Sequence, residues 1–512
     1  MLLIICMTEL HAQTFQWAVR MGLSGSSTAT GLITDGAGSV YTTGYFSGTV
    51  DFDPGPATYN LNSSGGEDIF VTKVDVNGNF VWARKMGGSL YDRGNSITTD
   101  GAYLYITGSF EGTANFDAAP NIANLTSAGS ADVFVLKIDN SDALSGASRM
   151  GGSSSDAGNS ISIGSGGAVY VTGNFSGTFN ANTAQGVVTL TSAGGDDVFV
   201  ASFVGVSLAW VVQTGGADND SGNGIAVNST GQLLCTGSFG SVVDFDPGVA
   251  VVNMTSAGSR DIYVLKLSST GLFQWAKQLG GTGDDIGRGI ARDNSNNIYT
   301  TGSFQGTADF NPAVGVTNLV SAGGADIFIS KLDNSGTYVW AKSSGGSGSD
   351  IGFGVKTDAS NNVYATGAFS SSCDFDPSAG VYPLQAAGST DIFIMKSDAS
   401  GNFIWAKGAG GTGADYGYGI FVPSTSVIYT AGSFSGTADF DPGPNTFNLT
   451  AAGGSNIFIL KLNGCGSGYA TASFTGCDSV VINGIQYNNT GYYTQLYNNI
   501  SGCDSNTVYN VT

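Results

Sequence analysis

Short apolar runs alternate along this chain with clusters of Gly, Asn, Asp and Ser, and no useful length of 3.6-residue periodicity appears. Residues 289–344 contain four strand candidates, GIARD, NIYTTGSF, DIFISKLD and TYVWAKSS, separated by turn residues. Strands such as NIYTT and DIFIS carry apolar or aromatic residues on both faces, as expected when sheets stack face to face. The pattern predicts an all-β fold built from four-stranded units.

This unit recurs seven times at intervals of 64 or 65 residues, which the phrase TG[SNAY]F and its variant AGSF mark most clearly. The glycines of the phrase are Gly44, Gly108, Gly173, Gly237, Gly302, Gly367 and Gly432. A radial array of four-stranded sheets is a β-propeller, so we predict seven blades. Each unit is longer than common blade repeats because of a segment such as GTADFDPGPNTFNLTAAGG after its second strand, which we predict to be a protruding hairpin or loop.

One repeat is split between the two ends of the chain. The last copy reaches NIFILKLNG at 456–464 and lacks the Trp-containing strand, whereas FQWAVRMG at 15–22 is such a strand without the rest of its unit. We therefore predict that residues 15–20 pair with 457–462 and close the ring. An open β-solenoid is the alternative, but it would not need this complementary split.

The regions outside the repeats suggest export and a separate tail. Residues 1–13 resemble the end of a secretory signal peptide, with an apolar run and Ala12 near the expected cut. We expect the propeller to span 14–464 and a Cys-containing, β-rich module to span 465–512. In that module two GCDS phrases flank the strands INGIQY and GYYTQLY, which predicts a hairpin and a Cys477–Cys503 disulfide. No later apolar run approaches the ~18 residues needed to span a membrane.

The repeat carries a family resemblance. GGTGDDIGRGIARDNSNNIYTTGSFQGTADF, followed by GGADIFISKLDNSGTYVWAK, resembles the SBBP-type seven-bladed β-propeller repeat of secreted and surface proteins, including S-layer-like bacterial glycoproteins. The tail GCDSVVINGIQYNNTGYY resembles modules near the C-terminus of type IX secretion substrates. The resemblance implies an exported bacterial protein, secreted or at the cell surface. It implies no activity, because propellers host many.

Charge and composition narrow the function. The net charge of -21, from 39 acids and 18 bases without a Lys/Arg cluster, argues against nucleic acid as a partner. The single histidine, His11, lies in the expected leader, which leaves no imidazole for a Ser-His-Asp relay or a histidine metal site. A glycosidase needs two carboxylates in different environments, whereas the aspartates here mostly occupy equivalent repeat positions. We predict a nonenzymatic protein, with a carboxylate-based, polysaccharide-active enzyme as the alternative.

Two repeated acidic motifs are candidate cation sites. The turn GGxxxDxG joins an outer strand to the next inner strand, so we expect its aspartates to ring the mouth of the central channel. A bound cation such as Ca²⁺ would offset their repulsion, whereas an Asx-turn that caps its own backbone is the structural interpretation, which we favour. DFDPG, at 51–55, 244–248 and 439–443 with variants at Asp309 and Asp374, allows the same two interpretations, and capping is again favoured. The GGxxxDxG aspartates are Asp92, Asp156, Asp220, Asp285, Asp350 and Asp415.

Lysine and tryptophan also occupy fixed repeat positions. The strand lysines Lys73, Lys137, Lys266, Lys331, Lys396 and Lys461 share one position, for which we expect Asp partners. All six tryptophans share another, where blade packing is favoured over stacking on sugars, and a lectin-like propeller is therefore an alternative function. We predict a noncatalytic exported propeller whose face loops display or bind a surface polymer, glycan or protein. No cofactor is expected apart from the calcium considered above.

Overall fold

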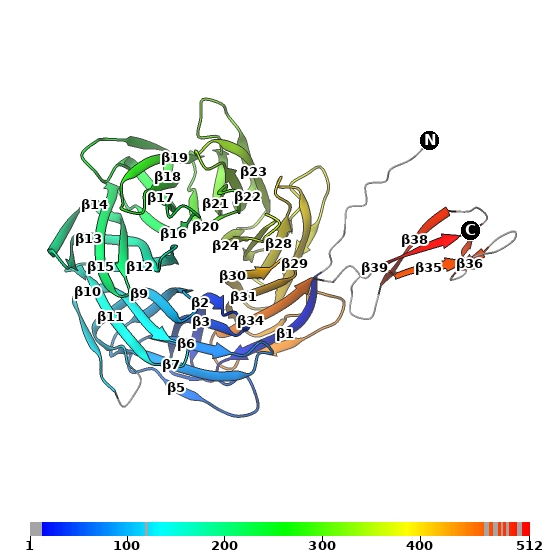
Figure 1. Ribbon diagram of the computed structural model, residues 1–512, viewed down its shortest axis with the longest axis horizontal. Coiled ribbons are helices and arrows are strands. Elements are labelled where there is room, and N and C mark those ends of the chain that lie inside the picture. The colour runs from blue at the N-terminus through cyan, green and yellow to red at the C-terminus, as the bar shows by residue number, and fades with distance from the viewer. Residues whose placement is uncertain are drawn as a thin grey trace.

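The computed structural model describes residues 13–117, 121–464, 470–474, 480–482, 485–487, 491–498 and 504–511. Every element in these residues is a β-strand, and none is a helix, which confirms the all-β prediction. Figure 1 shows the sheets of the repeats arranged around a central axis. Among the described residues, no helix is long and apolar enough to cross a membrane.

Each repeat forms antiparallel strand pairs in chain order, from a first strand beside the central axis to a fourth strand at the outside (Figure 1). The first strands are β2 (Ser26–Thr34), β8 (Asp92–Thr99), β12 (Asp156–Ile163), β16 (Ser221–Val227), β20 (Ile286–Arg292), β24 (Ile351–Thr357) and β30 (Tyr416–Ser424). The second strands are β3 (Val40–Ser47), β9 (Tyr103–Asn115), β13 (Ala168–Thr183), β17 (Leu233–Asp244), β21 (Ile298–Asp309), β25 (Val363–Phe369) and β31 (Val427–Phe434).

The third and fourth strands complete the units. The third strands are β6 (Asp68–Val74), β10 (Asn124–Asp139), β14 (Gly186–Val204), β18 (Asn253–Leu267), β22 (Asn318–Leu332), β28 (Asp391–Ser397) and β34 (Asn456–Gly464). The fourth strands are β7 (Phe80–Gly88), β11 (Leu144–Gly152), β15 (Ser207–Gly216), β19 (Phe273–Gly281), β23 (Tyr338–Gly346), β29 (Phe403–Gly411) and, from the start of the chain, β1 (Gln13–Met21). In the unit β20–β23, these strands match the four predicted from residues 289–344.

The two ends of the repeat region meet in one four-stranded sheet, with the order β1-β34-β31-β30. Phe15 pairs with Leu462 and Met21 pairs with Ile457, so the predicted pairing of 15–20 with 457–462 is confirmed. Ser27 of β2 strengthens the junction, because its amide donates to Ser455 O at 2.8 Å and its hydroxyl accepts from the Ile457 amide at 3.2 Å. The first and last repeats are therefore joined by strand pairing and by these additional bonds.

The additional segment in each repeat is a hairpin whose base belongs to the core. In the fifth repeat, Gly280 and Gly281 of β19 pair with Asp309 and Ala308, so the hairpin also joins the outer strand of the preceding repeat. The short hairpin strands that stand apart from the longer ones are β4 (Thr49–Asp51), β5 (Asn60–Asn62), β26 (Ser372–Asp374), β27 (Pro383–Gln385), β32 (Thr437–Asp439) and β33 (Asn448–Thr450).

A buried aromatic side chain anchors each hairpin. Phe310 is fully buried, with its ring 5.5 Å from that of Phe304 and 5.0 Å from that of Phe328. The same three-ring contact recurs in the other repeats, with Tyr263 as one member in the fourth. Burying one such ring stabilises the fold by about 1.5–3 kcal/mol. The hairpin is therefore a protruding tip on a buried base.

The described part of the tail pairs differently from the prediction. β36 (Val480–Ile482) pairs with β37 (Ile485–Tyr487), and β38 (Gly491–Asn498) pairs with β39 (Asp504–Val511), which is also parallel to β35 (Ala470–Phe474). The expected hairpin between INGIQY and GYYTQLY is therefore wrong. Its physical reason lies in the sequence, because the Asn-Gly at 483–484 is a stronger two-residue turn signal than the NNTG used in the prediction. Cys477 and Cys503 lie outside the described residues, so their disulfide stays a prediction.

Candidate functional site

The GGxxxDxG aspartates are buried between repeats and cap the backbone. Asp285 is fully buried, its Oδ2 accepts from the Gly281 amide at 2.7 Å, and its Oδ1 accepts from the Gln305 amide at 3.0 Å. The equivalent two bonds form at Asp92, Asp156, Asp220, Asp350 and Asp415. None of the six lines the central cavity, so their expected place at the channel mouth is wrong. The reason is that the turn folds each carboxylate back onto its own glycine.

Each of these carboxylates lies beside a second buried aspartate, the first residue of the DIF phrase. A Cβ atom placed on Gly280 would lie 2.9 Å from Asp261 Oδ1 and 3.0 Å from Asp285 Oδ2, so the pair flanks a position that only glycine fits. The Oδ1 atom of the DIF aspartate is buried without a hydrogen-bond partner in all six such repeats, at Asp68, Asp132, Asp197, Asp261, Asp326 and Asp391. Where the chain ends meet, Asn456 and Ser27 replace the two acids.

Burial sets the protonation of these pairs. Desolvation, with a smaller contribution from repulsion by the neighbouring DIF aspartates Asp261 and Asp197, raises the pKa of Asp285 to about 6 and that of Asp220 to about 7. Backbone hydrogen bonds lower the same pKa values, but by less than desolvation raises them. Within the described residues, no group of three or more His, Cys, Asp or Glu side chains is placed to hold a metal ion. The observed contacts are those of turn caps, and a cation at these aspartates stays a prediction.

The DFDPG carboxylates also form turn caps. Asp51 Oδ1 accepts from the amides of Asp53 and Tyr59 at 3.1 and 2.8 Å, and Asp53 Oδ1 accepts from Gly55 at 2.7 Å. The same contacts recur at Asp244 and Asp439. These bonds fix the turn at which the hairpin leaves its buried base.

The repeated tryptophans and lysines join neighbouring repeats. Trp340 Nε1 and Lys331 Nζ both donate to Ala399 O, at 3.2 and 2.8 Å, and the Trp340 ring lies 6.0 Å from that of Tyr299. Lys331 also lies over Tyr299 and 4.0 Å from Asp293. Trp17 and Lys461 share Val76 O in the same way across the junction of the chain ends. These contacts assign the residues to packing between repeats, as favoured for the tryptophans. Among the strand lysines in the described residues, the expected Asp partner lies within 4.0 Å only of Lys73 and Lys331.

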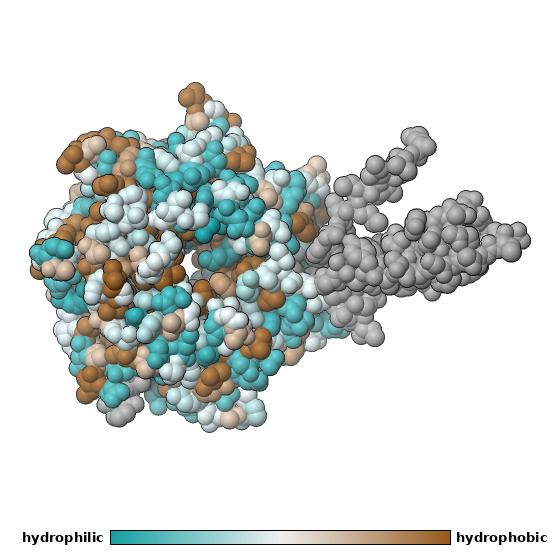
Figure 2. Space-filling view, in the orientation of Figure 1, coloured by the Kyte–Doolittle hydropathy of each residue, from teal (hydrophilic) through white to brown (hydrophobic). Residues whose placement is uncertain are grey.

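The first strands surround a central cavity of about 580 Å³. Figure 2 shows the molecule hollowed at the centre of this face. On one wall, side-chain amides form a ladder between adjacent first strands. Asn95 Nδ2 donates to Gly158 O at 3.0 Å, Asn159 to Gly222 O at 3.1 Å, and Asn223 to Gly287 O at 2.8 Å. This wall is polar, and its amides are engaged in joining repeats.

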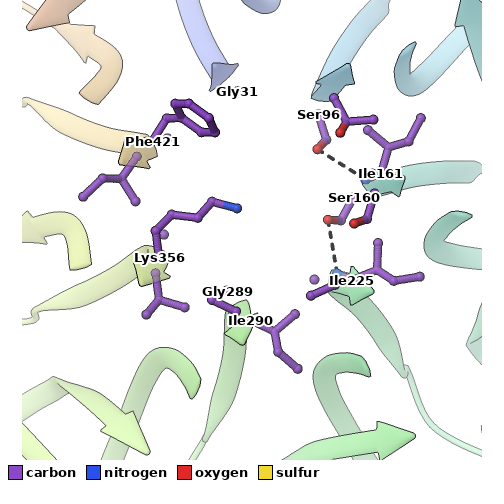
Figure 3. Close-up of a pocket in the computed structure, with 18 of the residues that line it drawn as sticks. Gly31, Ser96, Ser160, Ile161, Ile225, Gly289, Ile290, Lys356 and Phe421 are labelled. Atoms are coloured by element: carbon purple, nitrogen blue, oxygen red, sulfur yellow. Dashed lines mark hydrogen bonds between the residues drawn. The ribbon is translucent and has the colours of Figure 1, made fainter. Parts of the chain in front are cut away.

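The opposite wall lacks these asparagine hydrogen bonds between first strands. At the position of the asparagines, the next three repeats carry Arg288, Phe353 and Tyr418. The Arg288 guanidinium lies 5.4 Å from the centre of the Phe353 ring, which lies 4.8 Å from that of Tyr418. Figure 3 shows Lys356 of β24 extending into the opening, with Phe421 on the neighbouring strand. Sequence reasoning missed this wall, although comparing the repeats at the Asn95 position would have revealed the departure.

A second feature missed from the sequence lies at the hairpin tips. One repeat position is β-branched in every copy, and in five copies it holds a large apolar side chain that is 62 to 76% exposed. These five residues are Ile122, Val187, Val251, Val316 and Val381, and Thr58 and Thr446 occupy the position in the first and last repeats. Figure 2 shows hydrophobic residues at the protruding tips. We call these five side chains the rim residues.

Comparison with known proteins supports a β-propeller repeat protein. The family described as Beta-propeller repeat (SBBP) matches residues 274–307. An uncharacterized WD repeat-containing protein of Acanthamoeba polyphaga mimivirus is 23% identical over 504 residues, covering 82% of this chain and 36% of that protein. Regulatory protein FlaEY of Caulobacter vibrioides is 24% identical over 468 residues, covering 84% of this chain and 45% of that protein. The chain thus spans less than half the length of these relatives.

Solved structures give weaker likenesses. A protein of unknown function from Dyadobacter fermentans has a TM-score of 0.40 and 10% identity, covering 90% of this chain and 100% of the other. The GH43 protein BlXynB of Bacillus licheniformis has a TM-score of 0.25 and 10% identity, covering 88% and 98%. At such scores neither likeness carries an argument about activity.

Proposed function

We propose that residues 14–464 form a closed seven-bladed β-propeller that serves as a noncatalytic binding or display module of an exported bacterial protein. The pairing of β1 with β34 supports closure, because it completes the one unit that the chain order leaves without an outer strand. In this proposal residues 1–13 are the leader and residues 465–512 a separate module. The partner is a surface polymer, glycan or protein with a repeated structure.

The observation that carries this proposal is the exposure of the rim residues. Monomeric proteins tolerate scattered exposed apolar residues, but here one repeat position places them at five successive hairpin tips. Fully burying one such side chain against a partner contributes about 1.5–3 kcal/mol, so one tip binds weakly. Several tips that engage one repetitive surface gain strength from their high effective concentration. Multivalent attachment is therefore the function that this geometry supports best.

The arrangement of the carboxylates supports a noncatalytic role. The paired aspartates are buried, with at most 6% of each residue exposed, so none of these pairs offers a substrate an accessible acid and base. Cys235 and Cys373 are buried thiols, and burial raises the pKa of Cys235 to about 12, which keeps that thiol protonated and unreactive at neutral pH.

Threonine at the rim position provides the test, since the first and last repeats already carry it. The variant combines Ile122→Thr, Val187→Thr, Val251→Thr, Val316→Thr and Val381→Thr in the full chain. Sedimentation with insoluble envelope material of the producing cells should show binding reduced at least about tenfold, because apolar burial at five tips is lost.

A matched control changes exposed valines elsewhere, with Val76→Thr, Val81→Thr and Val339→Thr together. These substitutions should leave sedimentation unchanged. Envelope binding by the rim variant equal to that of the unaltered protein would overturn attachment through the tips. Hydrolysis of an envelope polysaccharide by the purified protein would overturn the noncatalytic role.

A further inference from the structure

We propose that the central channel binds a small organic anion, such as a sugar-sized carboxylate or phosphate, with Lys356 and Arg288 as the groups that recognise its charge. This site is distinct from the rim, and the proposal holds whether or not the rim attaches to a surface. It begins from two of the three cations that line the channel of a chain whose net charge is -21; the third, Arg292, already donates to Val227 O and Asp293 O.

Neither cation has an acidic partner. Lys356 makes no hydrogen bond or ion pair within the described part of the chain, and Figure 3 shows its nitrogen reaching into the opening. The Lys356 side chain is exposed within the channel, and the protein around the opening lowers its pKa by desolvation, with no carboxylate acting in the other direction. Arg288 Nε is buried without a hydrogen-bond partner. The carboxylate near Arg288, Asp284, is already held by two bonds from Arg260, at 2.8 and 2.7 Å. An anion in the channel would supply the missing partner.

Comparison with the other repeats shows that packing between repeats does not require Arg288 or Lys356. Asn223 bonds to the next first strand, and an asparagine at position 288 could continue the ladder towards Gly352 O. The chain instead places arginine there and gives up that link between repeats. At the Lys356 position other repeats carry small or apolar residues, such as Thr98, Ser162 and Ala226. A purely structural wall gains nothing from either cation, because Arg288 Nε is buried without a partner, which is unfavourable, and Lys356, which is exposed to the channel, makes no contact that stabilises the wall.

The remaining walls suit an anion with an organic body. Ser96 Oγ accepts from the Ile161 amide at 3.3 Å, and Ser160 Oγ accepts from the Ile225 amide at 3.2 Å (Figure 3). Each hydroxyl hydrogen is thereby left to donate to a ligand oxygen. Phe421, beside Lys356, offers an apolar surface to the uncharged part of the ligand.

The size of the site agrees with this ligand class. The cavity of about 580 Å³ lies within the range typical of small-molecule sites. Lys356 follows Phe353, the neighbour of Arg288, by three residues, which corresponds to roughly 10 Å along a strand. A ligand that contacts both cations must span this offset between their strand positions, so we expect a sugar-sized molecule rather than an inorganic ion.

Calorimetric titration of the full chain tests the proposal with three probes: D-glucuronate, D-glucose 6-phosphate and neutral D-glucose. We expect at least one of the two anions to saturate below about 10 mM and D-glucose not to bind, because only the anions can form charge-assisted hydrogen bonds with Lys356 and Arg288. Binding of D-glucose as tight as that of both anions, or no binding by either anion, would overturn the proposal.

The variants replace each cation with the residue found at the same position of another repeat, as at Thr98 and Asn223. Lys356→Thr and Arg288→Asn should each weaken anion binding at least about tenfold, in line with the loss of one charge-assisted bond. Lys277→Gln removes the same charge from outer strand β19 and should leave affinity unchanged. If Lys356→Thr fails to fold, Lys356→Gln takes its place and Lys356→Arg should retain binding. Unchanged affinity in both folded channel variants would overturn the site.

Discussion

The junction between the first and last repeats differs chemically from the junctions between successive repeats. Where the chain is continuous, two buried aspartates such as Asp261 and Asp285 flank a glycine. Where the chain ends meet, Asn456 and Ser27 take their places, and Asn456 Oδ1 accepts from the Ala452 amide at 2.8 Å. Burying a neutral amide that is hydrogen-bonded is less unfavourable than burying a carboxylate. The one junction formed without a covalent link therefore avoids the charge that the linked junctions tolerate.

The largest expected effect comes from removing the strand that makes this junction. Deleting residues 14–21 takes away the buried Met21 and Ala18 and exposes the edge of β34. We expect the free energy of unfolding to fall by at least about 5 kcal/mol and the protein to aggregate, because an unpaired apolar edge strand recruits other chains. Urea unfolding and analytical ultracentrifugation measure both effects.

The control for this deletion removes residues 465–512. No described strand of that segment pairs with the strands of the repeats, so the urea midpoint should stay unchanged. A monomeric deletion variant of 14–21 with the original midpoint would show that the junction contributes little.

Of the two kinds of junction, only those that contain two buried aspartates should make the free energy of unfolding depend on pH, because Asn456 and Ser27 do not titrate. Burial raises the pKa of Asp92, Asp285 and Asp350 to about 6 and that of Asp156 and Asp220 to about 7, from an unfolded value of 3.8. Protons bind the folded state more tightly, so this stabilisation is complete below pH 3.8 and is lost as pH rises through 6 to 7. We expect a higher urea midpoint at pH 5 than at pH 8. An equal or lower midpoint at pH 5 would contradict the assigned burial.

At still lower pH, aspartates whose folded pKa is lowered have the opposite effect, because their protonation destabilises the folded protein. At Asp35 burial acts to raise the pKa, but hydrogen bonds from Ser39, Tyr41 and Ala37 outweigh it, so the folded pKa is lowered. The stability that such groups contribute is present above their unfolded pKa and is lost as pH falls through the folded value. The pH 5 measurement lies between the two effects.

Transferring the acidic pair to the neutral junction sharpens the comparison. Ser27→Asp combined with Asn456→Asp should lower the free energy of unfolding at pH 8 by about 2–4 kcal/mol, because two carboxylates are buried where no chain connection holds the repeats together. The loss should be smaller at pH 5, where the pair shares a proton. Chemical unfolding at both pH values measures it, and an equal loss at both would argue against a charge effect.

The smallest expected effect concerns the glycine between the acids. Gly280→Ala would place a Cβ atom 2.9 Å from Asp261 Oδ1 at a backbone φ of +151°, which should destabilise the protein by about 1–3 kcal/mol. Gly36→Ala is the matched control, since its Cβ would meet nothing within 4 Å. Thermal melting of the two variants should separate them, and equal melting temperatures would contradict the close approach.

The repeat pattern is enough to predict the strands and the β1–β34 pairing, because the outer strand that the last repeat lacks is found at the start of the repeat region. The same pattern could not place side chains within a turn, and Asp285 was expected at the channel when it bonds back to Gly281. The buried base of the hairpin was also missed, since Phe310 stands in a polar segment. The channel wall with Arg288 and Lys356 required knowing which repeat positions face the axis.

The pairing of the two chain ends is the central structural claim, and a disulfide across it is its most direct measurement. Val19 and Ile459 are partners in the β1–β34 ladder, and directly opposed residues of antiparallel strands have Cα atoms about 4.5–5.5 Å apart, within reach of a disulfide. In Val19→Cys/Ile459→Cys, mild oxidation of the folded protein should form this bond in nearly all molecules and raise the melting temperature. Folded protein in which both thiols stay free would contradict closure through the N-terminal strand.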